Sequence, residues 1–311
     1  MDYRHLFGPL LSRRLGLSLG VDLINHKVCS FDCVYCECGA TTEKTTERRE
    51  YVPIFRVIEE LKVYFADRPQ LDYITFSGSG EPLLNKGIGV LIQYIKEHFI
   101  GYPLALLTNS VLLSDPEVRS EILPCDLVVP SLDAVSKEAF NKVNRAAPGI
   151  HPMEMIEGLV QFRREFKGKI WLEIFIVPGA NDSPQELDLL SKAAERIKPD
   201  RVQINMLDRP GTESWVRPLT AEEMSRVMGF FKRIKVELVP QKASTRLNAM
   251  LNEDMPEKLF SIIQRRPIRL EDIARTLGVP ETMLSPILDK LIAESRIEFV
   301  TEERGVYFRA K

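Results

Sequence analysis

Three cysteines stand close together near the start of the chain, in the run Val28-Cys29-Ser30-Phe31-Asp32-Cys33-Val34-Tyr35-Cys36. Thiolate sulfur is a soft metal ligand, and iron–sulfur clusters are held by cysteine thiolates. A [4Fe–4S] cluster takes four cysteines when it is fully ligated, so three thiolates hold three irons and leave the fourth open to another ligand. The spacing therefore predicts a metal site at Cys29, Cys33 and Cys36 that holds a cluster with one vacant iron.

Other uses of cysteine fit this sequence less well. A zinc site needs a second pair of Cys or His at finger-like spacing, and none follows. Five cysteines in 311 residues without a signal peptide fit a reducing cytosol better than a disulfide framework. Cys38 is either a bystander in the loop or a redox-sensitive neighbour, and its ligation of the cluster is the less favoured interpretation. Cys125 heads an apolar run and is most simply a small buried hydrophobic residue.

The C-x3-C-x2-C spacing, with the aromatic Tyr35 directly before the last cysteine, resembles the signature loop of the radical S-adenosylmethionine (SAM) superfamily. The resemblance implies a [4Fe–4S] cluster and SAM as cofactors, with Tyr35 among the cofactor-binding residues. It also implies that the amino and carboxylate groups of SAM's methionine chelate the open iron. One electron from an external reductant then splits the sulfonium and gives a 5′-deoxyadenosyl radical, which acts on an unidentified substrate.

Composition limits the class of protein. Apolar content of 44% and charged content of 28% are those of a globular protein with a substantial core, and the length suits one large and one small domain. The net charge is −2, so no global excess of positive charge attracts nucleic acid or an anionic membrane. The charged first residues do not form a signal sequence, and no apolar stretch is long enough to span a membrane. We therefore expect a cytoplasmic protein with no membrane partner.

From about residue 17 to residue 240, short β-rich runs alternate with longer amphipathic segments. The predicted strands are 17–24, 72–77, 104–108, 126–131, 170–177 and 201–207. The predicted helices are 53–66, 86–98, 115–122, 153–167, 184–197 and 220–233. This alternation predicts an α/β fold, a partial (β/α)6 TIM-like barrel whose working face lies at the C-terminal ends of its strands. The cysteine loop, residues 26–40, follows the first strand and so falls on that face.

The pattern changes after Val239-Pro240. We expect a radical SAM barrel over 1–240, a linker over 241–254 and a small domain over 255–311. The small domain has predicted helices at 256–265, 270–277 and 282–294 and a hairpin of strands 296–300 and 305–309. Three helices followed by a hairpin resemble a winged helix-turn-helix domain.

The segment after the second strand, Ser77-Gly78-Ser79-Gly80-Glu81-Pro82, resembles the Gly-Gly-Glu-Pro element of the superfamily, with Ser79 in place of the first glycine. The resemblance implies that Gly78, Ser79, Gly80 and Glu81 bind SAM, with the backbone and the carboxylate meeting the methionine ammonium. Glycine lets a main chain approach a ligand that a Cβ would exclude. Gly-Ser-Gly turns are common, so this segment alone is weak support.

Two further turns follow the third and fourth strands. Asn109, in Leu107-Thr108-Asn109-Ser110, resembles the Thr-Asn-Gly element beside the SAM ribose, and Ser131 and Asp133 match the position of a Ser and an acid that face the ribose or carboxylate. Taken singly, an Asn turn and a helix N-cap are simpler interpretations. The order of all four segments after successive strands favours a radical SAM enzyme.

Later loops are less informative. The segments 177–182 and 205–213 follow the fifth and sixth strands, and the second carries Asp208, Arg209 and Glu213. A solvated, charged loop is the favoured interpretation, with substrate contact as the alternative. Arginines that can meet phosphate or carboxylate, but are ordinary when exposed, occur at Arg13, Arg14, Arg48 and Arg49.

The reaction itself is not specified. The barrel, with Gly-Val-Asp-Leu-Ile before the cluster loop and Leu-Asp-Arg-Pro-Gly-Thr-Glu late on, looks like the branch related to the tRNA-modifying 4-demethylwyosine synthases. Those synthases use extra cysteines for a second cluster, and here no cysteine precedes Cys29; the charge balance also lacks a tRNA-binding footprint. The Gly/Glu turn equally resembles glycyl-radical activating enzymes, whose substrate is a protein glycine. Modification of a small molecule or a peptide is a third alternative.

A different class of function is a DNA-binding regulator that senses redox state or SAM through the C-terminal domain. Residues 255–311 carry ten Lys and Arg and nine Asp and Glu, and the expected recognition helix, 282–294, has the single cation Lys290. Contacts with phosphates supply most non-specific DNA affinity, and this helix makes few of them. We therefore favour a protein- or substrate-docking role for this domain.

Overall fold

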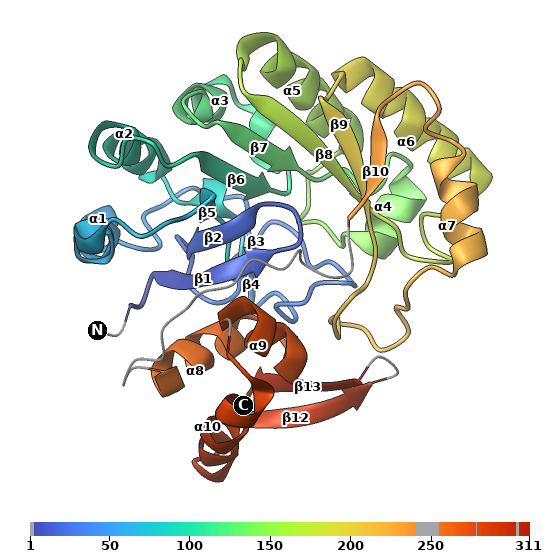
Figure 1. The fold of residues 1–311 in the computed structure, drawn as a ribbon. Helices are drawn as coiled ribbons and strands as arrows, with labels where there is room; N and C mark the ends of the chain where they lie inside the picture. The colour runs from blue at the N-terminus through green and yellow to red at the C-terminus, as the bar shows by residue number, and fades with distance from the viewer. Residues whose placement is uncertain (1–2, 240–254, 278, 303–304) are drawn as a thin grey trace.

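The computed structural model describes residues 3–239, 255–277, 279–302 and 305–311. Its larger part is a curved eight-stranded sheet with helices along its outer side (Figure 1). The strand order is β1-β2-β5-β6-β7-β8-β9-β10, antiparallel between the first two strands and parallel throughout the rest. This is the α/β arrangement, with a parallel sheet, that partial barrels share.

All six predicted strands are present; the strand at 104–108 has the predicted bounds, and the other five have shifted ends. They are β2 (Gly16–Val21), β5 (Tyr73–Phe76), β6 (Leu104–Thr108), β7 (Leu127–Pro130), β8 (Lys169–Phe175) and β9 (Arg201–Asn205). The first strand ends at Val21 rather than at residue 24, because the Asp22 carboxylate accepts the Ile24 N–H and turns the chain. The last ends at Asn205 rather than at residue 207, where the Asn205 side chain accepts the Met206 N–H.

Two strands at the sheet edges were not predicted. β1 (Leu6–Ser12) contains Pro9 and a register shift, so its sequence lacks a strand's regular alternation, and it pairs with β2 as a hairpin. β10 (Val236–Leu238) is three residues long and pairs only with β9. The sequence therefore predicted the parallel centre of the sheet but not its edges.

The helices connect successive parallel strands. They are α1 (Ile54–Tyr64), α2 (Ile88–His98), α3 (Pro116–Ile122), α4 (Lys137–Val143), α5 (Pro152–Glu165), α6 (Pro184–Ile197) and α7 (Ala221–Met228). Short 3-10 helices are η1 (Phe65–Asp67), η2 (Pro82–Leu84) and η3 (Val111–Ser114). In α6 the Ser183 side chain caps the Glu186 N–H, and Leu187 and Leu190 are fully buried against the sheet. The predicted helix 220–233 is shorter in the structure: α7 ends at Met228, followed by Gly229 in a right-handed conformation.

The C-terminal part is a smaller unit of three helices and a three-stranded antiparallel sheet of order β11-β13-β12. Its elements are α8 (Met255–Arg265), β11 (Ile268–Arg269), α9 (Leu270–Leu277), α10 (Glu281–Ala293), β12 (Ile297–Glu302) and β13 (Gly305–Ala310). The expected helices and hairpin are present, and β11 was not predicted. The winged-helix assignment and the domain boundaries stay predictions, and the expected linker 241–254 lies outside the described residues.

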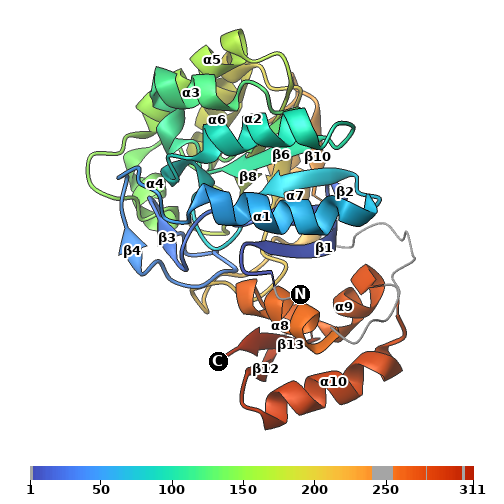
Figure 2. The same ribbon diagram turned by 90° about the vertical axis from the view of Figure 1, so that its left-hand side faces the viewer.

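The C-terminal unit lies against β1, with α8 directly below that strand (Figure 2). Its apolar core includes Leu259 and Ile263 and continues into Leu10 of β1, with Phe7 packed at its margin. The Tyr307 hydroxyl donates to the Asp208 carbonyl oxygen at 2.9 Å, in the loop after β9. The unit therefore joins both edges of the curved sheet.

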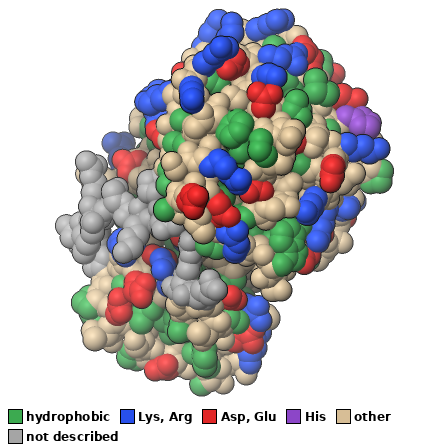
Figure 3. All heavy atoms as spheres, turned by 90° about the vertical axis from the view of Figure 1, so that its right-hand side faces the viewer, with side chains coloured by type: hydrophobic (Ala, Val, Ile, Leu, Met, Phe, Trp, Pro, Cys, Tyr) green, Lys and Arg blue, Asp and Glu red, His purple; other side chains and the backbone are tan. Residues whose placement is uncertain are grey.

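The surface is mixed in charge. On the face shown in Figure 3, basic and acidic side chains are interspersed over the barrel helices. No described helix has the length and apolar character needed to cross a membrane.

Candidate functional site

The cysteine loop follows β2 at the C-terminal edge of the parallel strands. Within it, β3 (Val28–Cys29) pairs with β4 (Glu43–Lys44), and a turn closes through the Cys36 N–H and the Cys33 carbonyl at 3.1 Å. This fold brings the three predicted thiols together. Burial raises the pKa of the Cys33 thiol, and the nearby charges of Asp133, Cys36 and Cys29 raise it further.

Each of the three sulfurs has its own N–H donor, and each donor comes from a different part of the chain. Lys27 Nζ lies 3.0 Å from Cys36 Sγ, while Asn109 Nδ2 and Asn144 Nδ2 lie 3.5 Å from Cys29 Sγ and Cys33 Sγ. N–H donors to sulfur stabilise thiolates and tune cluster potentials. Among the described residues, no three or more His, Cys, Asp or Glu side chains surround the position of a single metal ion.

Lys27 supplies positive charge to this group of thiols. It is 3% exposed, and although burial opposes its charge, its interactions with Cys36 and then with Cys29 outweigh burial and raise its pKa. The pKa of Cys36 is lowered to about 5, first by a hydrogen bond from the Cys38 thiol and then by Lys27. Cys38 thus contacts Cys36 rather than standing apart. The donor set of three thiols, one ammonium and two amides fits an anionic iron–sulfur cluster.

The glycines of the segment after β5, residues 77–82, allow this segment to pack against the cysteine loop. A Cβ on Gly80 would lie 1.9 Å from the Val28 carbonyl oxygen, and one on Gly78 would lie 2.2 Å from the Asp22 carboxylate. Ser79 occupies the intervening position because its N–H and hydroxyl both donate to Asp22 Oδ2, at 3.1 and 2.7 Å. This segment therefore lies next to the thiols, as the sequence predicts.

Glu81 connects the second and third strand-end turns. Its carboxylate is 2% exposed and accepts hydrogen bonds from Thr108 Oγ1 and the Asn109 N–H, each at 2.7 Å, and from the Leu83 N–H at 3.1 Å. Burial raises its pKa to about 7, against the lowering effect of these donors. Both oxygens are thus engaged within the protein, and contact between Glu81 and a SAM ammonium stays a prediction.

Of the other predicted cofactor residues, Tyr35 and Asp133 belong to one hydrogen-bond network, and Ser131 lies outside it. Asp133 accepts hydrogen bonds from the Tyr35 hydroxyl at 2.5 Å, from Asn144 Nδ2 at 2.7 Å and from the Phe175 N–H at 2.9 Å, and its pKa is raised by burial. The Tyr35 ring stacks on Phe175 with centroids 3.8 Å apart. Ser131 lies at the end of β7, where its carbonyl accepts the Ser110 hydroxyl at 2.7 Å. The network fixes Tyr35 and Asp133 beside Cys33.

Three residues of this site were missed by the sequence analysis: Asp22, Lys27 and Asn144. Asp22 is the first residue after β2, a position where site residues of parallel sheets concentrate, so its place was a usable signal. Lys27 is two residues before Cys29, and a cation beside thiolates was likewise a signal. Asn144 follows α4, and nothing in its local sequence connects it to Cys33.

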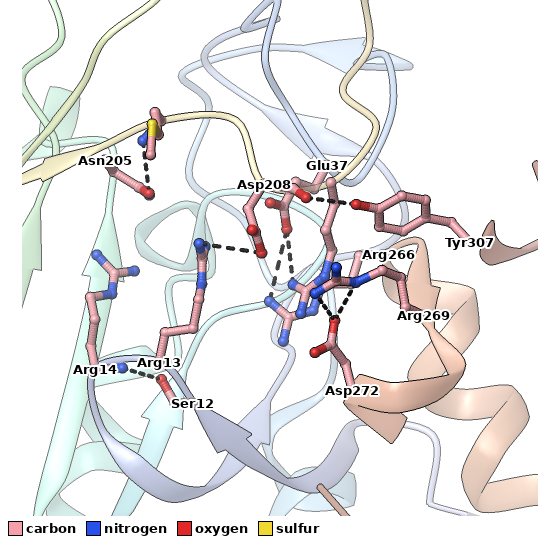
Figure 4. A network of polar contacts seen from close by, with 12 residues as sticks. Ser12, Arg13, Arg14, Glu37, Asn205, Asp208, Arg266, Arg269, Asp272 and Tyr307 are labelled. Atoms are coloured by element: carbon pink, nitrogen blue, oxygen red, sulfur yellow. Dashed lines mark hydrogen bonds and ion pairs between the residues drawn. The ribbon is translucent and has the colours of Figure 1, made fainter. Parts of the chain in front are cut away.

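The loop after β9 differs from its prediction as a solvated loop. Asp208 and Arg209 are 6% and 7% exposed, because the C-terminal unit covers them. Asp208 pairs with Arg13 at 3.5 Å and Arg209 pairs with Glu37 at 3.2 Å (Figure 4).

The remaining charged residues singled out in the sequence form ion pairs. Glu213 pairs with Arg145 at 2.5 Å, and Arg14 pairs with Glu173 inside the barrel. Away from the thiols, the other pairs are Arg48–Glu121 at 2.5 Å and Arg49–Glu43 at 2.6 Å.

Comparison with known proteins gives this arrangement a family context. The profile of the Radical SAM superfamily matches residues 26–190, slightly more than half of the chain. A relative from Brachyspira hyodysenteriae named GTPase Obg is 37% identical over 299 residues, covering 94% of this chain but only 43% of the relative. UPF0026 protein MJ1312 of Methanocaldococcus jannaschii is 30% identical over 309 residues, covering 97% of this chain and 94% of that protein.

Among solved structures, a radical SAM methyltransferase from Sphaerobacter thermophilus aligns with a TM-score of 0.53. The alignment covers 71% of this chain and 65% of that one at 16% identity, so it is a likeness of fold alone.

Proposed function

This chain belongs to the radical SAM superfamily of enzymes, and we propose that it holds a [4Fe–4S] cluster at Cys29, Cys33 and Cys36 and cleaves SAM there. The observation that carries the proposal is the set of three N–H donors, one on each thiol, from separate parts of the chain. When bound, such a cluster delivers one electron from an external reductant to SAM, which yields methionine and the 5′-deoxyadenosyl radical.

The chain's own residues prepare the site for this chemistry. Lys27 balances the negative charge of the thiolates, and Asn109 and Asn144 orient two of them. Glu81 fixes Asn109 through its backbone N–H. Gly78, Ser79 and Gly80 place the second turn against the cysteine loop, where we propose that it binds SAM with Tyr35, Ser131 and Asp133 on the opposite side. Rigid support of this kind holds reacting groups in position.

For the specific reaction, we propose two alternatives. The resemblance to the branch of 4-demethylwyosine synthases and the resemblance to glycyl-radical activating enzymes both remain alternatives for the substrate. The free thiols and the expected cytosolic location fit an enzyme that works under reducing conditions.

A DNA-binding regulator is not favoured. In the C-terminal unit, Arg296 pairs with Glu257 at 2.6 Å, Arg309 with Glu298 at 2.6 Å and Lys290 with Glu294 at 3.9 Å. Cations that are already paired are less available to phosphates.

Anaerobic reconstitution with iron and sulfide tests the proposal. We expect about four irons per chain, an S = 1/2 electron paramagnetic resonance signal after reduction, and 5′-deoxyadenosine formed from SAM. Cys125→Ala is the matched control, because Cys125 is a buried thiol of the barrel core and should leave all three readouts unchanged. Tight binding of one zinc ion in place of the cluster, or a signal without SAM cleavage, would overturn the proposal.

A further inference from the structure

A cavity of about 790 Å³ lies between the cysteine loop and the C-terminal unit. Cys36, Cys38 and Ser79 line it on the barrel side, and Arg265 and Arg266, at the turn between α8 and β11, line it on the other. Pockets of roughly 300–1,000 Å³ are the size that binds small molecules. The thiols and the two arginines therefore face one space.

Arg265 is held in place by two backbone carbonyls and by the ring of Phe7, whose centroid lies 4.5 Å from the guanidinium carbon, and its ion pair with Asp22 is long. Its side chain is 13% exposed, and its two terminal nitrogens donate to the carbonyl oxygens of Ser261 at 2.8 Å and Arg4 at 3.2 Å. Its Nε is buried without a hydrogen-bond partner, and the nearest carboxylate oxygen, Asp22 Oδ2, lies 3.7 Å from it. The Nε–H of Arg265 thus remains an unused donor, and a buried donor without an acceptor carries a desolvation cost.

Arg266 is paired still more weakly. Within the described part of the chain its one ion pair is with Glu37, at 4.0 Å, and Glu37 already accepts a hydrogen bond from Arg209 Nη1 at 3.2 Å (Figure 4). The side chain of Arg266 is 32% exposed, so part of the guanidinium remains open to a ligand. The Arg209 guanidinium, together with burial, lowers the pKa of Arg266 to about 10.

Positive charge exceeds negative charge along this wall. Among the described residues that line the cavity, five have cationic side chains and three have carboxylates, namely Arg4, Arg265, Arg266, Arg309 and Lys311 against Asp22, Glu37 and Glu298. An excess of cationic groups around a cavity is stabilised by an anion, and guanidinium binds phosphate and carboxylate through paired N–H donors.

We propose that Arg266, supported by the charge of Arg265, binds a phosphate or carboxylate group of a small-molecule substrate in this cavity. The substrate role rests on the proposed function, whereas the anion site stands on the cavity and its charges. The C-terminal unit then forms one wall of the active site, and the substrate is a compact anion enclosed between the two units rather than a tRNA or a folded protein.

Binding of inorganic phosphate to the full-length, cluster-loaded protein tests the site. The ³¹P line width is titrated anaerobically, without reductant and at constant ionic strength. We expect saturable broadening in the wild type and at least about tenfold weaker binding, or about 1.4 kcal/mol, in Arg266→Gln. Arg266→Lys, which keeps the charge but loses the paired donors, should fall between the two. Arg233→Gln, at an 82% exposed arginine that lines none of this cavity, is the matched control and should bind like the wild type.

Competition identifies the anion. Succinate that reverses the phosphate broadening assigns the site to carboxylates as well, and succinate without effect assigns it to phosphate. Absence of saturable broadening in the wild type, or equal titrations of the wild type and Arg266→Gln, would overturn the inference. Because no reductant is present, a protein that binds phosphate but never cleaves SAM contradicts the proposed function alone.

Discussion

The cysteine loop and the turn between α8 and β11 border the same cavity, yet they carry opposite charge. On the barrel side, the thiols gather around Lys27, and amides are directed at two of the sulfurs. On the other side, the guanidinium groups of Arg265, Arg266 and Arg309 outnumber the lining carboxylate, that of Glu298. The first region suits a metal cluster and the second suits an anion. The comparison teaches that one site is assembled from two distant parts of the chain, each with its own electrostatic task.

Removing a thiol should have the largest effect, and it tests whether the barrel side alone holds the cluster. Cys33→Ala should reduce 5′-deoxyadenosine formation by more than about 100-fold, since loss of outer-shell partners of a metal alone costs 10–100-fold. The measurements are iron content and nucleoside yield, with Cys125→Ala as the control. If Cys33→Ala kept four irons and still cleaved SAM, Cys33 would not be a ligand of the cluster.

Glu81 should make the barrel's stability depend on pH. Its pKa is raised to about 7 by burial, so the folded protein binds a proton more tightly than the unfolded chain does, and the free energy of unfolding falls as the pH rises from about 4.5 to about 7. For this buried group the loss is on the order of 3 kcal/mol. Urea unfolding of the apoprotein at several pH values should show a flatter dependence in Glu81→Gln.

The matched control is Glu223→Gln, at a solvent-facing carboxylate that caps α7, which should keep the wild-type slope over that interval. An unchanged slope in Glu81→Gln would mean that the carboxylate is ionised throughout.

A substitution of Lys27 tests the effect of positive charge beside the thiols, without removing a ligand of the cluster. Lys27→Met should lower cluster retention by about tenfold, because the thiolates lose their buried counter-charge. The midpoint potential of the cluster should become more negative, since positive charge favours the reduced form. Lys44→Met, at an exposed lysine of the same loop that bonds the Arg145 carbonyl, should change neither value. Equal potentials in the two variants would remove Lys27 from this role.

The smallest effect should come from weakening the contact between the C-terminal unit and the loop after β9. Tyr307→Phe removes the hydrogen bond to the Asp208 carbonyl, which should cost about 1 kcal/mol and weaken phosphate binding by about two- to threefold. Tyr102→Phe removes a similar bond, to the Pro69 carbonyl within the barrel, and should lower stability without changing phosphate affinity. If both variants bind phosphate equally well, the hydrogen bond between Tyr307 and Asp208 does not position the anion site.

Sequence patterns predicted the barrel side well, because its signals are local. The thiol spacing, the Gly78 to Glu81 turn and the parallel strands are each contained in short segments of chain. The other side could not be predicted in this way. Asp208 and Arg209 have the sequence of a solvated loop, and they are buried only because the C-terminal unit packs over them. Asn144 contacts Cys33 although the two residues are 111 positions apart in the sequence, and no local pattern encodes such a contact.

The apolar core that Leu10 shares with Leu259 and Ile263 constrains how the molecule is made. A ribosome synthesises strand β1 (Leu6–Ser12) long before its packing partner α8 (Met255–Arg265), because the whole barrel lies between them in the chain. The outer face of the hairpin therefore stays exposed while the barrel is synthesised, and the nascent barrel depends on the arrival of α8, or on chaperone cover, to avoid aggregation. Shortening the chain before α8 would make that exposure permanent.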